Sequence, residues 1–189
     1  MMPPTWKVFV EGKADRRFVS TLLTVLGIAN VEAEQIGGGV SHLKFDTVRN
    51  LLQRSIREGC RVATVLDADE SVAARRAELE EIKSDLGLTI EQSFWLPNDV
   101  DPGCLETLLE GVAVEGHHGV FSCLDQYVEC LDGFGRGYEG PTGKGRIYAY
   151  CEAVDAERRE EQRDYMNDEH WDLNASVLEP LRAFLGGLT

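Results

Sequence analysis

The sequence has few of the features that mark membrane, secreted or thiolate-metal proteins. Its apolar runs are only a handful of residues long, too short for a membrane span. The start, Met-Met-Pro-Pro-Thr-Trp-Lys, lacks the apolar stretch and small-residue cleavage site of a secretory signal. The 5 cysteines form no Cys-x-x-Cys pair, and the 4 histidines fall at none of the usual zinc spacings. We therefore expect reduced thiols and a cytoplasmic protein without a membrane anchor.

Basic residues are scarce as well, because 19 Lys and Arg stand against 33 Asp and Glu, a formal net charge of −14. This argues against loose adherence to nucleic acid through a broad positive field. A nucleic-acid enzyme stays open, because clustered carboxylates are what a cation site needs and a bound divalent metal reverses the local sign. With 43% hydrophobic and 28% charged residues in 189, the composition excludes disorder and rod-like coiled coils.

Strand-like and helical patterns alternate through the first half of the chain. The alternation predicts βαβ units, and hence a parallel sheet with helices on both faces. From residue 104 onward the pattern is helical. We therefore predict an α/β fold with a four-stranded parallel core at 1–103 and a helical extension at 104–189 packed on it. The expected strands are 6–10, 31–36, 61–66 and 93–96, and the expected tail helices are 104–113, 120–131, 147–163 and 176–185 around a glycine-rich loop at 133–145.

Three local expectations concern single segments. Ser41 is suited to cap the helix after the second strand, whose apolar stripe begins at Phe45. The mixed-charge run 157–164 is expected to be a solvated face. The apolar stripe of the helix at 120–131 either packs within the chain or forms a homodimer contact, and packing within the chain is favoured.

Acidic residues or glycines directly follow three of the predicted strands. Glu11-Gly12 ends the first strand, residues 37–39 (three glycines) the second, and Asp67-Ala-Asp69 the third. Because the carboxyl ends of parallel strands share one edge of a sheet, these groups are expected to converge. Carboxylates about 4 Å apart repel by roughly 4 kcal/mol at an effective dielectric of about 20. Such a cluster must bind a proton, pair with a base or hold a cation, and oxygen ligands favour Mg²⁺ or Mn²⁺.

Each of these groups also has an ordinary structural explanation. Asp67 or Asp69 is suited to cap the helix that follows. Asp15 stands in a first helical turn, where the helix dipole favours an acid. A glycine run is typical of a turn, although it also lets a phosphate approach the backbone. Glu11 lies between an apolar strand and a glycine and contributes little to packing, so a functional role explains it better.

The residues 10–15 (Val-Glu-Gly-Lys-Ala-Asp), the glycine run and residues 66–69 (Leu-Asp-Ala-Asp) resemble, in this order, the Toprim domain of topoisomerases, bacterial primases and OLD-family nucleases. The resemblance covers roughly residues 6–97 and implies a Rossmann-like core. It implies that Glu11 acts as general acid or base and that Asp67 and Asp69 hold Mg²⁺. OLD-type nucleases use a second acid four residues after the glutamate, and Asp15 matches it.

The segment 94–109, with its Pro-Asn and Gly-Cys-Leu-Glu sequences, is similar to a group of uncharacterised bacterial Toprim-like proteins. That similarity extends into the helical tail and names relatives without naming a substrate. Glu106 would be a further metal ligand, or an acid behind the ligands, if its helix begins beside the strand ends. An ordinary carboxylate at a helix start is the alternative.

Together these observations predict a Mg²⁺-dependent phosphoryl-transfer enzyme, specifically a nuclease. The expected partners are nucleic acid as substrate and, from the resemblance, an ATPase of the kind that accompanies OLD-type nucleases. A nucleotide or small phosphoester hydrolase suits the acidic composition better, and a non-catalytic interaction module is a third hypothesis. The residues given roles are Glu11 as base, Lys13, Gly38 and Gly39 at the phosphate, and Asp67, Asp69, Asp15 and Glu106 at one or two metal positions.

Overall fold

The structure is a computed structural model that describes residues 6–134 and 140–188. The chain divides into two compact units. Unit 1 consists of residues up to Leu105 together with the segment from Leu178 onward, and unit 2 is Glu106–Val177. Each unit is described by itself below.

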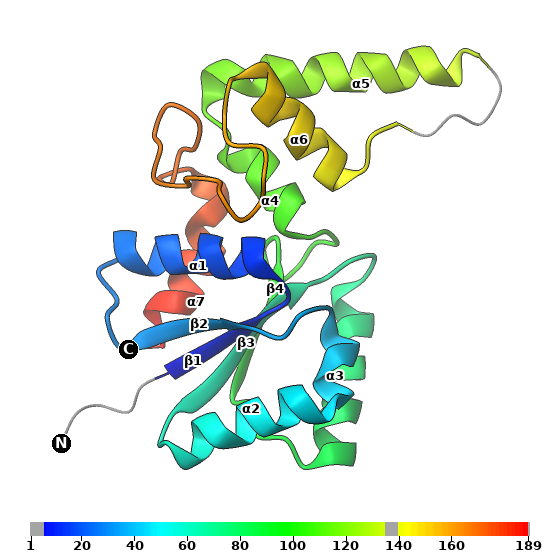
Figure 1. The fold of residues 1–189 in the computed structure, drawn as a ribbon. Coiled ribbons are helices and arrows are strands. Elements are labelled where there is room, and N and C mark those ends of the chain that lie inside the picture. Colours follow the sequence, from blue (N-terminus) through cyan, green and yellow to red (C-terminus); the bar gives the residue numbers. More distant parts are fainter. Residues whose placement is uncertain (1–5, 135–139, 189) are drawn as a thin grey trace. The chain divides into compact units, whose positions relative to one another are not determined.

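Unit 1 is built on a four-stranded sheet in the order β2-β1-β3-β4, with every neighbouring pair parallel (Figure 1). In the register of the sheet, Val10 at the end of β1 lies opposite Gln35 and Val65. The carboxyl ends of all four strands therefore lie along one edge, which confirms the predicted α/β fold and parallel sheet. The strands are β1 (Trp6–Val10), β2 (Val31–Gln35), β3 (Arg61–Asp67) and β4 (Gln92–Leu96).

Helices cover both faces of this sheet, as predicted. One face carries α1 (Lys13–Val25) and α7 (Glu179–Gly186), and the other carries α2 (Asp46–Arg57) and α3 (Val72–Leu86) (Figure 1). The core under α2 and α3 contains Phe9, Leu52, Val62, Leu66 and Leu79, all buried.

The last helix of the chain was expected to belong to the helical extension, and it belongs to unit 1 instead. The ring of Phe184 on α7 lies 5.3 Å from the ring of Phe94 on β4, and Leu181 and Leu185 are buried. Burial of these apolar side chains against the sheet explains why this segment returns to the first unit.

The prediction that Ser41 caps the second helix is wrong. Ser41 lies inside a short 3₁₀ turn, η1 (Val40–Lys44), and α2 begins only at Asp46 with Phe45 as its N-cap. The turn buries Val40 and Leu43, three residues apart on one side, so it packs as an element of its own. Phe45 is 54% exposed rather than part of the buried stripe.

Unit 2 is helical and has an aromatic core. The ring of Tyr150 stacks on Phe121 at 5.2 Å and meets the edge of Trp171 at 5.3 Å. Tyr165 packs on the same tryptophan at 5.6 Å. The elements of this unit are α4 (Leu105–Val112, in unit 2 from Glu106), η2 (Glu115–His117), α5 (His118–Asp132), α6 (Gly143–Ala153) and an irregular segment up to the turn η3 (Ser176–Leu178).

The helix expected at 147–163 is the least accurate prediction, because α6 starts earlier and ends at Ala153. Asp155 has a left-handed backbone (φ 56°), which stops the helix. Most residues of 157–164 are exposed, as expected for a solvated face. Arg163 is the exception, because it is 1% exposed and its guanidinium lies 5.2 Å from the ring centre of Tyr148. Residues 135–139 of the predicted glycine-rich loop lie outside the described residues.

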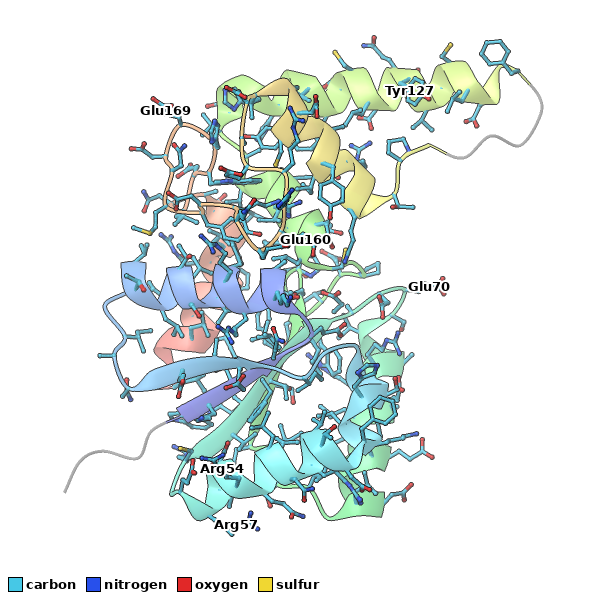
Figure 2. The ribbon with its side chains drawn as sticks, viewed as in Figure 1. Arg54, Arg57, Glu70, Tyr127, Glu160 and Glu169 are labelled. Carbon is cyan, nitrogen blue, oxygen red and sulfur yellow. The ribbon has the colours of Figure 1, made fainter. Side chains whose placement is uncertain are left out.

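Helix α5 buries less of its apolar stripe than was favoured from the sequence. Phe121 is buried, whereas Tyr127, labelled on α5 in Figure 2, is 53% exposed. A homodimer contact through α5 remains a prediction. Within residues 6–134 and 140–188, no helix is both long and apolar enough to cross a membrane.

Candidate functional site

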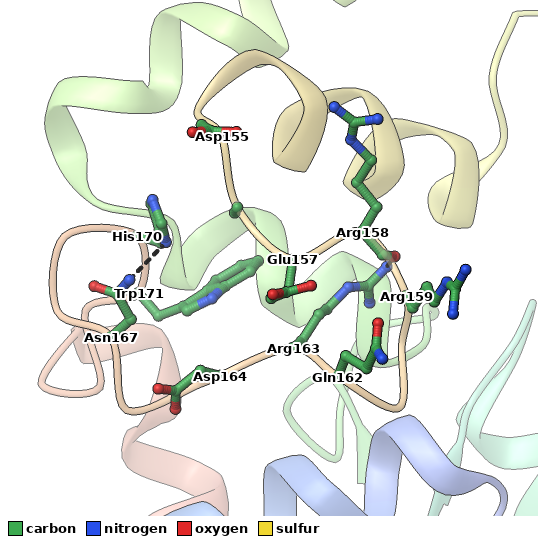
Figure 3. Close-up of a pocket in the computed structure, with 11 residues that line it drawn as sticks. Asp155, Glu157, Arg158, Arg159, Gln162, Arg163, Asp164, Asn167, His170 and Trp171 are labelled. Carbon is green, nitrogen blue, oxygen red and sulfur yellow. Dashed lines mark hydrogen bonds between the residues drawn. The ribbon is translucent and has the colours of Figure 1, made fainter.

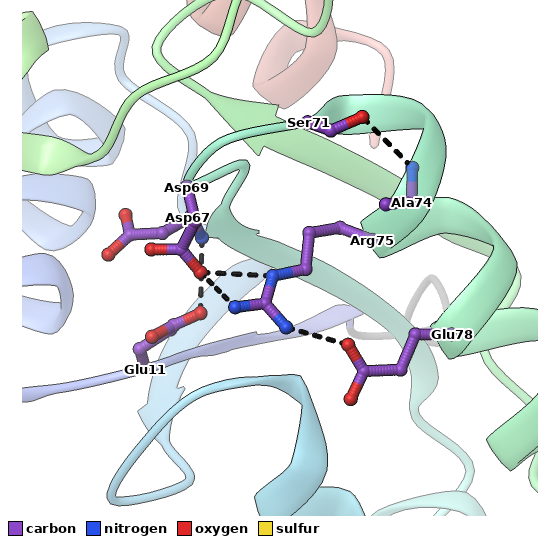
Figure 4. A network of polar contacts seen from close by, with 7 residues as sticks. All are labelled: Glu11, Asp67, Asp69, Ser71, Ala74, Arg75 and Glu78. Atoms are coloured by element: carbon purple, nitrogen blue, oxygen red, sulfur yellow. Dashed lines mark hydrogen bonds and ion pairs between the residues drawn. The ribbon is translucent and has the colours of Figure 1, made fainter.

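The ends of β1 and β3 come together through the side chain of Glu11. Its Oε1 accepts a hydrogen bond of 3.1 Å from the backbone N–H of Asp67, 56 residues further along the chain (Figure 4). The parallel pairing of Val10 with Val65 brings the two strand ends side by side. The expected convergence of the first-strand acid with the third-strand acids is therefore present.

Asp67 connects the end of β3 to the start of α4. Its Oδ1 accepts a 3.1 Å hydrogen bond from the backbone N–H of Leu105, the first residue of that helix. The helix directly after β3 is capped by another residue, since Ser71 Oγ accepts from the backbone N–H of Ala74 at 3.2 Å. The alternative in which Asp67 caps α3 is thus replaced by a contact with a more distant segment.

Asp69 is held in an unusual backbone conformation and faces an arginine. Its φ is 49°, and it exchanges two backbone hydrogen bonds with Gly103, of 2.8 and 2.7 Å. Its Oδ2 accepts from Arg75 Nε at 2.9 Å and also from Nη2 of the same guanidinium. Arg75 Nη1 donates in turn to Glu78 Oε2 at 2.7 Å (Figure 4). Asp69 therefore takes part in an ion-pair chain on the first turns of α3.

Two of the predicted residues lie at the start of α1. Asp15 is 8% exposed, and its Oδ2 accepts a 3.0 Å hydrogen bond from the backbone N–H of Gly12. Asp15 lies in the first turn of α1, as its structural alternative requires, and its charge also acts on Glu11. Lys13 is the first residue of α1 and is exposed.

The three glycines after β2 form a tight loop beside Glu11. Gly37 has φ 86°, a left-handed conformation that favours glycine, and its N–H donates to the Glu11 carbonyl at 2.9 Å. A Cβ on Gly38 would meet the His42 ring at 2.4 Å, so any side chain there would require this ring to move. A Cβ on Gly39 would lie 3.6 Å from Glu11 Oε2. The glycine loop therefore brings bare backbone next to the Glu11 carboxylate.

Glu106 lies in unit 2, in the first turn of α4, and is 6% exposed. Within that unit, the negative charges of Glu160 and Glu106 raise the pKa of Lys144. Glu106 is therefore a buried acid at a helix start. Its role as a metal ligand stays a prediction.

The electrostatic surroundings of Glu11 favour its neutral form. Burial raises the pKa of Glu11 to about 7, and the negative charges of Asp15 and Asp69 add to the rise. The backbone N–H of Asp67 and the positive charge of Arg75 act in the opposite direction, because they favour the ionised form. A carboxyl group whose pKa lies near neutrality is suited to take a proton as a general base.

In the part of the chain that the structure describes, no group of three or more His, Cys, Asp or Glu side chains is arranged to hold a metal ion. The contacts explain this, because Asp69 faces Arg75 and Asp67 accepts from Leu105. The donor chemistry does fit Mg²⁺ or Mn²⁺, since Glu11, Asp67 and Asp69 offer only carboxylate oxygens from adjoining strand ends. A cation here would also offset the negative charges of Asp15 and Asp69, which add to the effect of burial on the pKa of Glu11. To bind this cation, the Asp69 carboxylate must turn away from Arg75.

Arg75 is the residue of this site that the sequence did not reveal. It lies on α3, and only the fold brings its side chain to the end of β3. A cavity of about 540 Å³ opens beside it. The cavity is lined by Asp69, Glu70, Ser71, Ala74, Arg75 and Glu78.

Unit 2 has a separate cavity of about 670 Å³, lined by residues between 155 and 171 (Figure 3). Asn167 Nδ2 lies 3.1 Å from His170 Nδ1 on its wall. The formal charges of the lining cancel, so the cavity has no excess of one sign with which to attract a charged ligand. The charged lining residues are Arg158, Arg159 and Arg163 against Asp155, Glu157 and Asp164.

The fold and the site define a class: a Rossmann-like α/β protein with acidic groups gathered at the carboxyl edge of a parallel sheet. The chain belongs to the DUF3226 family, described as proteins of unknown function, whose family model matches residues 5–189. No curated protein and no solved structure matches the chain. Because the family description names no activity, the Toprim resemblance and the chemistry it implies remain predictions.

Proposed function

We propose that this DUF3226 protein is a Mg²⁺-dependent phosphoryl-transfer enzyme that hydrolyses phosphodiester bonds in nucleic acid. The observation that carries the proposal is the contact between Glu11 and the Asp67 backbone. It joins a carboxyl group with a pKa of about 7 to the end of the strand that presents Asp67 and Asp69. A base poised near neutrality beside paired carboxylates suits hydrolysis of a phosphate ester.

In the proposed reaction, Glu11 accepts a proton from the attacking water. The water oxygen forms a bond to phosphorus, the bond from phosphorus to the leaving oxygen breaks, and the leaving oxygen takes a proton from solvent. Asp67 and Asp69 would hold Mg²⁺, which when bound neutralises charge that grows on the phosphoryl oxygens. Lys13 and the backbone around Gly38 and Gly39 are the proposed contacts to the phosphate.

A nucleotide or small phosphoester hydrolase is the second candidate. The net charge of −14 favours it, because a small ester presents fewer phosphates for the protein to attract than a polynucleotide does. For the nuclease, an ATPase partner of the kind that accompanies OLD-type nucleases would supply the missing basic surface. This partner remains part of the proposal and rests on the resemblance alone.

Cleavage assays with purified variants test this function. We expect Mn²⁺- or Mg²⁺-dependent cleavage of a labelled oligonucleotide that EDTA abolishes. Asp67→Asn and Glu11→Gln should each lower kcat/KM by about 100-fold or more, as loss of a group that stabilises transition-state charge or moves a proton does. Asp85→Asn and Glu80→Gln make the same chemical changes at exposed positions of α3 and should leave cleavage unchanged.

The outcomes separate the three hypotheses. Faster cleavage of a mononucleotide ester than of an oligonucleotide would favour the small phosphoester hydrolase. Equal cleavage by the wild type and Asp67→Asn would mean that the activity does not reside at this edge. No metal-dependent cleavage of either substrate, with Glu11→Gln as folded as the wild type, would favour the non-catalytic module.

A further inference from the structure

Arg75 and Asp69 form a contact that any cation bound at the strand end must break. Both Nε and Nη2 of Arg75 donate to the same carboxylate oxygen, Asp69 Oδ2. A divalent cation would seek the same carboxylate, because it prefers charged oxygen ligands. Guanidinium and metal therefore compete for Asp69.

Glu78 keeps Arg75 near the site when the contact to Asp69 is broken. The third guanidinium nitrogen, Nη1, donates to Glu78 Oε2 at 2.7 Å from one turn further along α3. The Arg75 and Asp69 side chains are 34% and 47% exposed, and the 540 Å³ cavity lies beside both. The guanidinium thus has an anchor on its own helix and space into which it can swing.

The planar guanidinium matches a phosphate group as well as a carboxylate. Its parallel N–H groups bind two oxygens of a phosphate at once, which makes arginine the usual residue for this contact. The positive charge of Arg75 also acts on Glu11 through space. It is therefore already positioned beside the group proposed to activate water.

We propose that Asp69 exchanges Arg75 for the divalent cation, and that the released guanidinium then binds a non-bridging oxygen of the substrate phosphate. This inference rests on the proposed function and assigns its phosphate-binding residue. In the protein without metal, the Arg75 guanidinium pairs with Asp69 and offsets part of the negative charge at the strand ends. When metal and substrate are bound, the same side chain contributes to substrate affinity.

The adjacent arginine provides a matched control. Arg76 is also on α3 and also pairs with an aspartate, donating from Nη2 to Asp99 Oδ2 at 2.5 Å. Arg75→Gln and Arg76→Gln therefore make the same change one residue apart, and each removes an exposed ion pair. Only the first removes a competitor for Asp69.

The test measures Mn²⁺ binding without substrate, by electron paramagnetic resonance of the free ion, and then the KM for a phosphodiester. We expect Arg75→Gln to bind Mn²⁺ about tenfold more tightly than the wild type, a difference of about 1.4 kcal/mol. Its KM should rise by about tenfold or more, a loss of about 1.4 kcal/mol or more of binding. Arg76→Gln should change neither value. If Arg75→Gln unfolds, Arg75→Met is the second variant, with the same expectations.

Two results would overturn the inference, and they have different meanings. Unchanged Mn²⁺ affinity or unchanged KM in Arg75→Gln, with the wild type still binding Mn²⁺, would reject the exchange and leave the proposed function standing. Failure of the wild type and both variants to bind Mn²⁺ would reject the proposed function itself.

Discussion

Arg146 in unit 2 and Glu11 in unit 1 show opposite shifts, one toward the charged form and the other toward the neutral form. In unit 2, the Arg146 guanidinium donates to Glu110 from Nε at 2.7 Å and from Nη2 at 3.0 Å, and to Asp125 from Nη1 at 2.8 Å. These hydrogen bonds raise the pKa of Arg146 above its ordinary value. One cation is thus shared by acids from α4 and α5, and the arrangement favours the charged forms.

At the sheet edge of unit 1, the shift favours the neutral form. Burial and neighbouring acids raise the pKa of Glu11 to about 7, so ionising this carboxyl costs folding free energy. Ion pairs that hold a fold together move pKa values toward the charged form, as for Arg146. A carboxyl group whose ionised form is disfavoured by the fold gives no such gain in stability. Its position is therefore better explained by a function.

Breaking the unit 2 cluster should have the largest effect on stability. Arg146→Met leaves Glu110 and Asp125 without their shared partner, and we expect a loss of roughly 1–3 kcal/mol in the free energy of unfolding, given the partial exposure of the acids. Urea denaturation at neutral pH measures this. Arg158→Met removes an exposed ion pair with Glu152 and should cost less than about 1 kcal/mol. Equal effects of the two changes would contradict the structural role assigned to Arg146.

Glu11→Gln should stabilise the protein at alkaline pH. Since the folded pKa is raised, the unfolded chain releases its proton first, and the wild type loses stability as pH rises from about 4.5 to about 7. One pKa unit corresponds to about 1.4 kcal/mol. Allowing for the partial exposure of Glu11, we expect the difference in unfolding free energy between Glu11→Gln and the wild type to shift in favour of the variant by roughly 1–2 kcal/mol from pH 4 to pH 8. Denaturation in EDTA across this range checks it, and a pH-independent difference would refute the assigned cause.

The smallest effect is expected at the cap of α3. Ser71→Ala removes the oxygen that accepts from the Ala74 N–H, and we expect a loss of about 1 kcal/mol. Ser84→Ala, the same change at an exposed position within α3, should be neutral or slightly stabilising. Thermal unfolding of both variants makes the comparison. A full-sized loss in Ser84→Ala would show that Ser71 has no special role as cap.

The sheet edge could be predicted because its determinants are local. The apolar run at 61–66 and the alternating helices fix a parallel sheet, and parallel strands then require Glu11 and Asp67 to meet. Glycines after β2 likewise belong to that edge, and the structure places Gly39 against the Glu11 carboxylate.

Arg75 and the end of α6 could not be predicted, because their determinants are not local. Arg75 contacts Asp69 where the backbone of Asp69 turns left-handed and exchanges hydrogen bonds with Gly103, 34 positions further along the chain. Helix α6 ends where Asp155 turns left-handed, and the following chain packs its Trp171 into an aromatic core. Neither event leaves a periodic pattern in the sequence.

The most direct test of the central claim is a crystal of the protein soaked with Mn²⁺ and measured at the manganese absorption edge. The account predicts an anomalous peak within coordination distance of Asp67 and Asp69, close to Glu11, with Arg75 moved away from Asp69. A well-ordered strand edge that binds no manganese, with Arg75 still on Asp69, would contradict it.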